Sequence, residues 1–146
     1  MKEKERKFLL KYMPDLTVGR TEEIEQGYLM IGDGKQLRIR IIDKQDGWFC
    51  YKTYIDSTTR DEFEYLIPIQ DAVLLMSSTK QKLFKTRHKL KWGKYDVDID
   101  VYDELDLMTV EIEGDDVDSL TEFPPYFGVE ITGIKKYSNS SLANKK

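Results

Sequence analysis

Charged side chains two positions apart recur along this chain of 146 residues, and they are of the types that bind metal ions and phosphate groups. Residues i and i+2 of a β-strand point to the same face, so each such set would present its charges together. The acidic sets are Glu3 with Glu5, Glu62 with Glu64, Asp96 with Asp98 and Asp100, and Glu111 with Glu113. The basic side chains placed in the same way are Lys7, Arg38, Arg40, Lys52, Lys85 and Arg87.

These two sets of side chains suit different ligands. Arg and Lys bind phosphate oxygens, whereas clustered carboxylates without His or Cys select hard cations such as Mg²⁺ or Mn²⁺. His88 and Cys50 are the single histidine and the single cysteine, which excludes a metal site with several His or Cys ligands and a disulfide within the chain. A polyphosphate bound together with divalent cations is the ligand that satisfies both sets.

An antiparallel sheet with one solvated face is the simplest alternative explanation of the alternating pattern. A solvated face usually mixes neutral and charged polar residues, whereas most of these segments carry charges of one sign. Opposite charges on neighbouring strands stabilise a sheet by only about 0.2–1 kcal/mol per pair, which is a weak reason for so strict a pattern. We therefore expect the charged faces to line one lumen inside a barrel, with the apolar faces outward and covered by helices.

The formal charge of such a lumen follows from its residues. With Asp96 left aside, eight acidic and six basic side chains give the lumen a formal charge of −2. A polyanion should then bind poorly until a divalent cation arrives, so we expect activity to depend strictly on metal.

The order of elements predicts a mainly antiparallel α+β fold in one domain, residues 1–146, with many short strands closed into a barrel. Strands are predicted for the alternating segments 3–7, 37–41, 47–53, 61–67, 83–89, 95–102 and 109–114. A proline followed by an apolar-rich segment predicts one helix over 69–80. Short helices are expected near 13–19 and after Asp118, which would be an N-cap, and the tail from Tyr137 is expected to be weakly helical or loose.

Composition excludes several classes of protein. Hydrophobic residues make up 40% and aromatic residues 12% of the chain, which is typical of a folded domain rather than a disordered one. The net charge of −4 disfavours nucleic acid as a partner. No apolar run is long enough to span a membrane, and no signal peptide is evident. A single cysteine suits a reducing compartment, so we expect a cytoplasmic location.

Nine blocks of the sequence, in order, carry a resemblance to a known family. They are EKERKFLL (3–10), EQGYL (25–29), LRIRI (37–41), YKT (51–53), EFEY (62–65), KTR (85–87), VDIDVY (97–102), VEIE (110–113) and FGVEIT (127–132). The first block contains Glu-x-Glu-x-Lys, the opening signature of CYTH domains, also called triphosphate tunnel metalloenzymes. The chain resembles this family over nearly its whole length, and its length is similar to that of short bacterial members, many of which are inorganic triphosphatases.

The resemblance implies a closed eight-stranded antiparallel β-barrel with a few peripheral helices and a triphosphate bound inside. It implies that the metal is held by Glu3, Glu5, Glu62, Glu64, Glu111 and Glu113. Asp98 or Asp100 would join them, since the repetitive DVDID run leaves the register uncertain by two. It also implies that phosphate is bound by Lys7, Arg38, Arg40, Lys52, Lys85 and Arg87.

Three of these positions are candidate catalytic residues: Lys7, Tyr28 and Lys52. Tyr28 resembles the tyrosine that works with the first-strand lysine in short triphosphatases, and the alternative is an aromatic residue that caps one barrel end. Lys135 and Lys136 would place a further cation at the mouth, although the residues around them depart from the acidic stretch expected there.

The activity implied by the resemblance is hydrolysis of inorganic tripolyphosphate to pyrophosphate and phosphate with two ions of Mg²⁺ or Mn²⁺. One ion would bridge substrate oxygens and the second would lower the pKa of a water for in-line attack. Because no histidine is available as a base, we expect an alkaline optimum. Many short members are dimers, but nothing in the sequence identifies an interface, so a homodimer remains open.

Three alternatives share the tunnel: a class IV adenylate cyclase, a nucleoside or thiamine triphosphatase, and a polyphosphate-binding module without turnover. A cyclase needs an adenine pocket, for which Trp48, Phe49 and Trp92 are the aromatic candidates. The binding module would lack a member of the acidic set, and all six glutamates are present. His88 should point away from the lumen, and Cys50 should pack as a small apolar residue.

Overall fold

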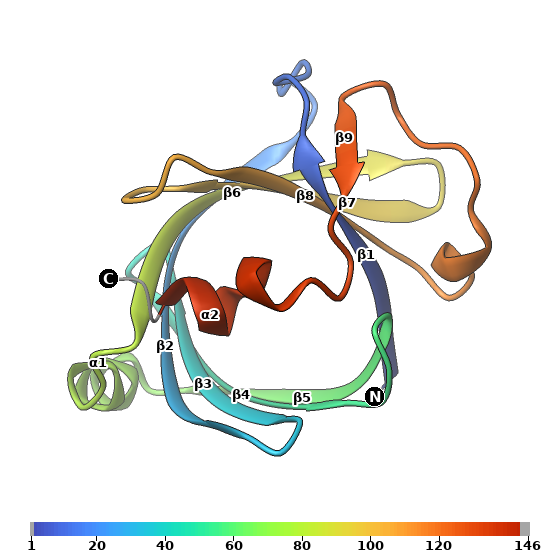
Figure 1. Cartoon of the computed structure of the whole chain (residues 1–146). Helices are drawn as coiled ribbons and strands as arrows, with labels where there is room; N and C mark the ends of the chain where they lie inside the picture. Colours follow the sequence, from blue (N-terminus) through green and yellow to red (C-terminus); the bar gives the residue numbers. More distant parts are fainter. Residues whose placement is uncertain (1, 144–146) are drawn as a thin grey trace.

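Nine antiparallel strands dominate the computed structural model, which describes residues 2–143 (Figure 1). The strands are β1 (Lys2–Leu10), β2 (Arg20–Gly32), β3 (Lys35–Ile42), β4 (Asp46–Tyr54), β5 (Thr59–Ile67), β6 (Lys82–Trp92), β7 (Tyr95–Tyr102), β8 (Met108–Glu113) and β9 (Phe127–Glu130). The helices are α1 (Ile69–Ser77) and α2 (Asn139–Ala143), and the 3-10 turns are η1 (Val117–Ser119) and η2 (Lys135–Tyr137). No helix among the described residues has the length and apolar character needed to cross a membrane.

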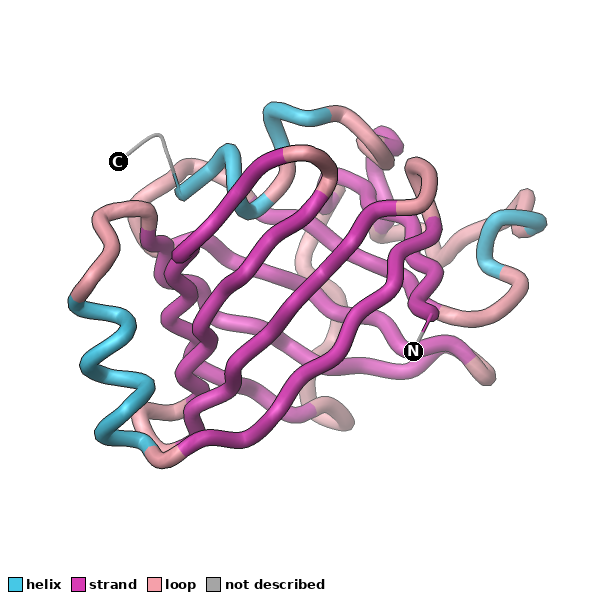
Figure 2. Tube along the Cα trace, turned by 90° about the horizontal axis from the view of Figure 1, so that it is seen from below, coloured by secondary structure: helices cyan, strands magenta, loops and turns pink. Residues whose placement is uncertain are grey.

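Eight of these strands close into a barrel, and Figure 2 shows them running diagonally along the barrel wall. The strand order is β5-β4-β3-β2-β6-β7-β8-β1, and β1 closes the ring by pairing with β5. At this closure Glu3 lies opposite Arg60, and further along β1 Glu5 lies opposite Glu113 of β8. Strand β9 is an extra strand that pairs with the end of β1. The predicted eight-stranded antiparallel barrel is therefore confirmed.

Alternation places the apolar side chains outside the ring, as the sequence predicts. Val97 and Ile112 lie in one outer core, which the segment 114–127 covers with residues such as Val117. A second outer core contains Ile39 and lies beneath α1. The expected covering is incomplete, because β5 presents two aromatic side chains to solvent: Phe63 is 46% and Tyr65 is 63% exposed.

The helix predictions were partly right. The helix predicted over 69–80 is α1, which ends at Ser77. The helix expected near 13–19 is wrong, because this segment is a loop with a turn, and Pro14 disfavours helical backbone at the residue before it. Asp118 is not an N-cap: it lies within η1, and its carboxylate is 3.6 Å from the Lys4 ammonium.

The C-terminal segment lies across one end of the barrel, where the red ribbon overlies the ring in Figure 1. Side chains of the barrel strands hold it: Lys7 of β1 donates to the Tyr137 carbonyl oxygen at 2.6 Å, and Gln36 of β3 donates to Ser140 at 3.1 Å. The Tyr102 hydroxyl of β7 donates to Asn139 at 2.6 Å. Apolar side chains from the tail and the barrel then pack together, namely Tyr28, Leu83, Tyr102, Leu142 and Ala143. The expected tail is thus helical in part, and its residues 144–146 lie outside the described residues.

Candidate functional site

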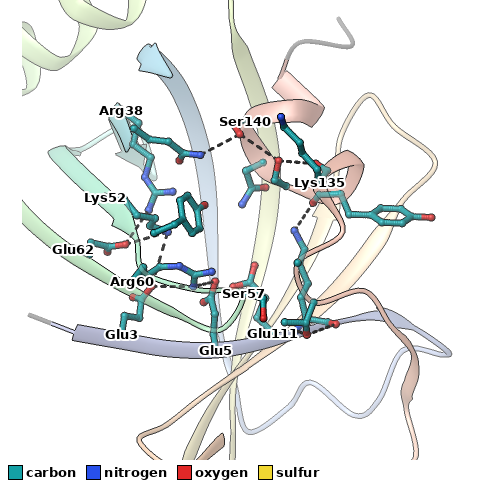
Figure 3. Close-up of a pocket in the computed structure, with 18 of the residues that line it drawn as sticks. Glu3, Glu5, Arg38, Lys52, Ser57, Arg60, Glu62, Glu111, Lys135 and Ser140 are labelled. Atoms are coloured by element: carbon teal, nitrogen blue, oxygen red, sulfur yellow. Dashed lines mark hydrogen bonds and ion pairs between the residues drawn. The ribbon is translucent and has the colours of Figure 1, made fainter. Parts of the chain in front are cut away.

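A cavity of about 700 Å³ lies inside the barrel (Figure 3), within the roughly 300–1,000 Å³ typical of small-molecule sites. Most of the residues singled out from the sequence line it. They are Glu3, Glu5, Lys7, Tyr28, Arg38, Arg40, Lys52, Glu62, Glu64, Arg87, Asp98, Glu111 and Glu113. Two others, Lys85 and Asp100, are buried and do not line it. The charged faces therefore meet in one lumen rather than in solvent.

Three carboxylates form a compact acidic cluster on this wall. Glu3, Glu5 and Glu113 each offer an oxygen within 4.8 Å of the others. Burial and the nearby Glu111 carboxylate raise the pKa of Glu5 to about 8, and burial and Glu3 raise the pKa of Glu113 to about 7. The raised values reflect the burial of these carboxylates and the repulsion between them, which a divalent cation would relieve. Carboxylate oxygens in such a set are the ligands that Mg²⁺ and Mn²⁺ prefer, so the residues present fit a hard cation.

Glu111 and Asp98 flank the acidic cluster. Burial alone would raise the pKa of Glu111, but the Lys7 ammonium and a hydrogen bond from Glu5 hold it well below its usual range. Asp98 lies 3.6 Å from Arg87 and 3.4 Å from Lys89. Glu111 is therefore ionised, and both carboxylates lie beside lysine and arginine side chains around the cavity.

Asp100 and Lys85 form a buried pair behind the cavity lining. Asp100 accepts hydrogen bonds from Lys85 at 2.8 Å and from the Arg87 Nε at 2.8 Å. Burial alone would raise the pKa of Asp100, but Arg87 and Lys85 hold it far below its usual range. Of the two aspartates that the sequence left undecided, Asp98 lines the cavity and Asp100 does not.

Three arginines form a cationic cluster on the cavity wall. Arg38, Arg40 and Arg87 all line the cavity, and burial and repulsion from Arg38 and Arg87 lower the pKa of Arg40. Arg40 donates to the Gln26 amide oxygen at 2.9 Å, whereas the buried Nε of Arg38 has no hydrogen-bond partner. Repelling, incompletely paired guanidinium groups favour a ligand with several negative charges.

Glu62 and Glu64 have partners outside the acidic cluster. The Lys52 ammonium is 3.1 Å from Glu62, and although burial would raise the pKa of Glu62, Lys52 and Arg38 hold it at about 2. Glu64 accepts a hydrogen bond from the Cys50 thiol at 3.4 Å. Cys50 is fully buried on its strand, as expected of a small packing residue, but its thiol points to the charged inner face rather than to an apolar core.

Lys7 and Tyr28, the residues expected to act together, both line the cavity but have separate hydrogen-bond partners. The Lys7 ammonium donates to the Tyr137 carbonyl oxygen, and the Tyr28 hydroxyl accepts a hydrogen bond from Gln26 at 2.6 Å. The Tyr28 ring also packs in the apolar cluster of the tail. Both interpretations of Tyr28 made from the sequence therefore remain open.

The sequence interpretation missed several residues that line the cavity. They are Lys35, Tyr54, Arg60, Lys89 and residues of the segments 31–34, 55–57 and 131–134. Arg60 continues the two-residue spacing of Glu62 and Glu64, so the signal was present in β5. Among the described residues, nine acidic and nine basic side chains line the cavity. The formal charge of the lumen is therefore balanced rather than −2, and the excess negative charge is local to the acidic cluster.

Most of the other residues singled out from the sequence lie away from the described cavity lining, and Lys135 is the exception. Phe49 packs beneath α1, and the Trp92 ring lies 6.0 Å from the Tyr95 ring in the outer core. His88 contacts Thr21 on the outside of the barrel, as predicted. Lys135 lines the cavity, whereas Lys136 lies over the Tyr137 ring.

Comparison with known proteins gives consistent matches along the chain. The sequence model of the CYTH domain family matches residues 1–127. The inorganic triphosphatase of Nitrosomonas europaea is 34% identical, over 98% of this chain and 97% of the relative. The inorganic triphosphatase of Acetivibrio thermocellus is 28% identical, over 97% and 92%. The solved structure of the inorganic triphosphatase NE1496 superposes with a TM-score of 0.69 at 30% identity, over 97% and 93%.

Proposed function

The chain belongs to the CYTH domain family, and we propose that it hydrolyses inorganic tripolyphosphate to pyrophosphate and phosphate inside its barrel, with divalent cations. One observation carries the proposal: a carboxylate cluster able to hold a cation and an arginine cluster able to hold a polyanion share one cavity. The names of the two relatives, which are both inorganic triphosphatases, support the choice of substrate.

Glu3, Glu5 and Glu113 are the side chains that would hold a first ion of Mg²⁺ or Mn²⁺, with Glu111 and Asp98 beside them for a second. A bound divalent cation supplies Lewis-acid charge at phosphate oxygens and lowers the pKa of a water molecule.

The chain's cations bind and orient the substrate. Arg38, Arg40 and Arg87 present guanidinium groups that match phosphate oxygens and stabilise charge on the phosphoryl group during transfer. Lys52 adds an ammonium group on the neighbouring strand β4. The Arg87 guanidinium is fixed by Asp100, so its remaining donors point with little freedom.

The tail and the apolar cluster limit the access of water from one side of the lumen. Lys7 donates to the Tyr137 carbonyl oxygen, and its ammonium group lowers the pKa of Glu111. Lys7, Tyr28 and Lys52 stay the proposed catalytic side chains because all three line the cavity.

Phosphate release from tripolyphosphate, ATP and thiamine triphosphate, with EDTA, Mg²⁺ or Mn²⁺ between pH 6 and 10, tests the proposal. We expect fast, metal-dependent release from tripolyphosphate with little from ATP, and loss of that release in Glu5→Gln. Appearance of cyclic AMP from ATP would establish the cyclase instead, although none of its three aromatic candidates lines the cavity among the described residues. If no phosphate were released from any substrate, hydrolysis would be refuted and the alternative of a polyphosphate-binding module would stand.

A further inference from the structure

Arg60 of β5 already supplies the acidic cluster with a cation. Its Nη1 lies 3.4 Å from a Glu3 carboxylate oxygen and also contacts Glu5, as the dashed lines of Figure 3 mark. The strand register explains the placement, because Arg60 is directly opposite Glu3 where β5 closes the barrel on β1. The two carboxylates that would hold a divalent cation therefore contact a guanidinium group in this structure.

Arg60 is only partly satisfied by these contacts. Its side chain is buried, its Nε has no hydrogen-bond partner, and its guanidinium lies 5.1 Å from the Tyr54 ring. The residue also lines the cavity in which phosphate would bind. A buried donor without an acceptor is unfavourable, and phosphate is an acceptor that matches guanidinium geometry.

We propose that Arg60 couples the binding of metal and phosphate: it neutralises Glu3 and Glu5 without metal, and it becomes a phosphate ligand once a divalent cation has replaced it at Glu5. This inference rests on the proposed function. A cation that takes Glu5 breaks the ion pair and frees the guanidinium group for the substrate. Coupling of this kind is reciprocal, so phosphate bound to Arg60 also strengthens the binding of the cation.

The first test is the affinity for Mn²⁺ alone, measured by electron paramagnetic resonance without phosphate. Arg60→Met removes the competing cation, so we expect Mn²⁺ to bind about fivefold more tightly or better. Lys94→Met is the matched control, since Lys94 pairs with Asp116 outside the cavity and its loss changes the net charge equally. Arg60→Lys should keep the wild-type affinity because it retains a charge beside Glu5. Unchanged or weaker Mn²⁺ binding in Arg60→Met would overturn the proposal.

The second test is the affinity for pyrophosphate, measured by calorimetry in EDTA and in excess Mg²⁺. We expect Arg60→Met to weaken binding by about fivefold or more with Mg²⁺ and much less in EDTA, where the arginine is held by the carboxylates. An equal loss in both conditions would mean that Arg60 binds phosphate independently of metal, and it would refute the coupling. Arg60→Gln, also neutral, provides the same comparison if the methionine variant does not fold.

These two tests do not depend on turnover. Coupled binding in a protein that releases no phosphate would refute the proposed hydrolysis and leave the role of Arg60 intact. If the wild type hydrolysed tripolyphosphate and Arg60→Met bound Mn²⁺ and pyrophosphate as the wild type does, only the role of Arg60 would be refuted.

Discussion

The Lys85 ammonium lies 2.8 Å from an Asp100 carboxylate oxygen, and both side chains are almost fully buried. Arg87 donates two hydrogen bonds to the same carboxylate, at 2.8 and 3.0 Å. Of these three residues, only Arg87 reaches the cavity. Asp100 therefore holds Arg87 in place and balances two buried cations, rather than presenting an oxygen to a metal ion.

Replacing Asp100 with Asn should destabilise the protein strongly. The change removes the counter-charge 2.8 Å from Lys85 and Arg87, although Asp98 stays 3.6 Å from Arg87. Removing one partner of a buried ion pair costs about 3–5 kcal/mol. The free energy of unfolding in urea measures the effect. Asp96→Asn is the matched control, because Asp96 pairs with Lys91 at the surface and its loss should change stability little. If the Asp100→Asn variant were stable and bound fewer Mn²⁺ ions per molecule, the result would instead show that Asp100 is a metal ligand.

Stabilisation by Mg²⁺ should increase from pH 6 to pH 9. Burial and neighbouring carboxylates raise the pKa of Glu5 to about 8 and of Glu113 to about 7, above the ordinary glutamate value of 4.5. Protonation of these groups stabilises the metal-free protein fully below pH 4.5, and this contribution is lost as pH rises through 7 and 8. Mg²⁺ binds the ionised carboxylates, so it competes with protons at pH 6 and relieves charge repulsion at pH 9.

The measurement is the difference in melting temperature with and without Mg²⁺ at each pH, since groups away from the cluster cancel in that difference. Glu113→Gln removes one of the titrating carboxylates and should flatten the dependence. A difference that is constant or shrinks toward pH 9 would show that the cluster is not where Mg²⁺ binds.

The strand faces were predictable from the sequence because two-residue alternation fixes which side chains share a lumen, whatever the exact strand ends. Depth along the lumen was not predictable. Asp98 and Asp100 occupy the same face of β7, yet one lines the cavity and the other is fully buried, because the tail and apolar residues fill one side of the barrel. The spacing of residues within β7 carries no information about where the C-terminal tail, a segment distant in the sequence, packs in the barrel.

Arg60 shows a different limit of the sequence interpretation. Its spacing from Glu62 placed it on the inner face. The sequence interpretation did not include it, because each strand was expected to carry charges of one sign and Arg60 precedes the two acidic residues of β5. The pairing of β5 with β1 is needed to see that it lies against Glu3 and Glu5. A homodimer stays open, and the cytoplasmic location remains a prediction.

Glu113→Gln and Glu64→Gln should differ in metal binding, although the sequence assigns both residues to the metal. Glu113 belongs to the acidic cluster, so its loss should weaken Mn²⁺ binding by about tenfold or more, as removal of outer ligand partners alone costs about 10–100-fold. Glu64 pairs with Cys50 instead, and its change should leave the Mn²⁺ affinity close to that of the wild type. Equal losses in both variants, measured by electron paramagnetic resonance, would place Glu64 in the metal site.

Arg40→Met should lower activity without lowering the stability of the ligand-free protein. Arg40 is repelled by Arg38 and Arg87, so its removal relieves an unfavourable interaction that offsets the lost hydrogen bond to Gln26. The same removal takes away a donor that stabilises phosphate during transfer, so tripolyphosphate turnover should fall on the order of a hundredfold. The melting temperature without anion should stay equal or rise, and a large fall would mean that Arg40 is a structural residue.

Arg6→Met is the contrasting variant, because Arg6 lies on the outer face of β1. Its guanidinium binds Glu130 at 2.6 and 2.7 Å and the Leu120 carbonyl oxygen at 2.9 Å, which fixes the covering segment to the barrel. Loss of these bonds leaves the partly buried Leu120 carbonyl oxygen without this donor and should reduce the free energy of unfolding by about 1–3 kcal/mol. Turnover per folded molecule should remain near that of the wild type, since Arg6 does not line the cavity. If both arginine variants lost stability and activity together, the separation between the outer scaffold and the inner anion site would be wrong.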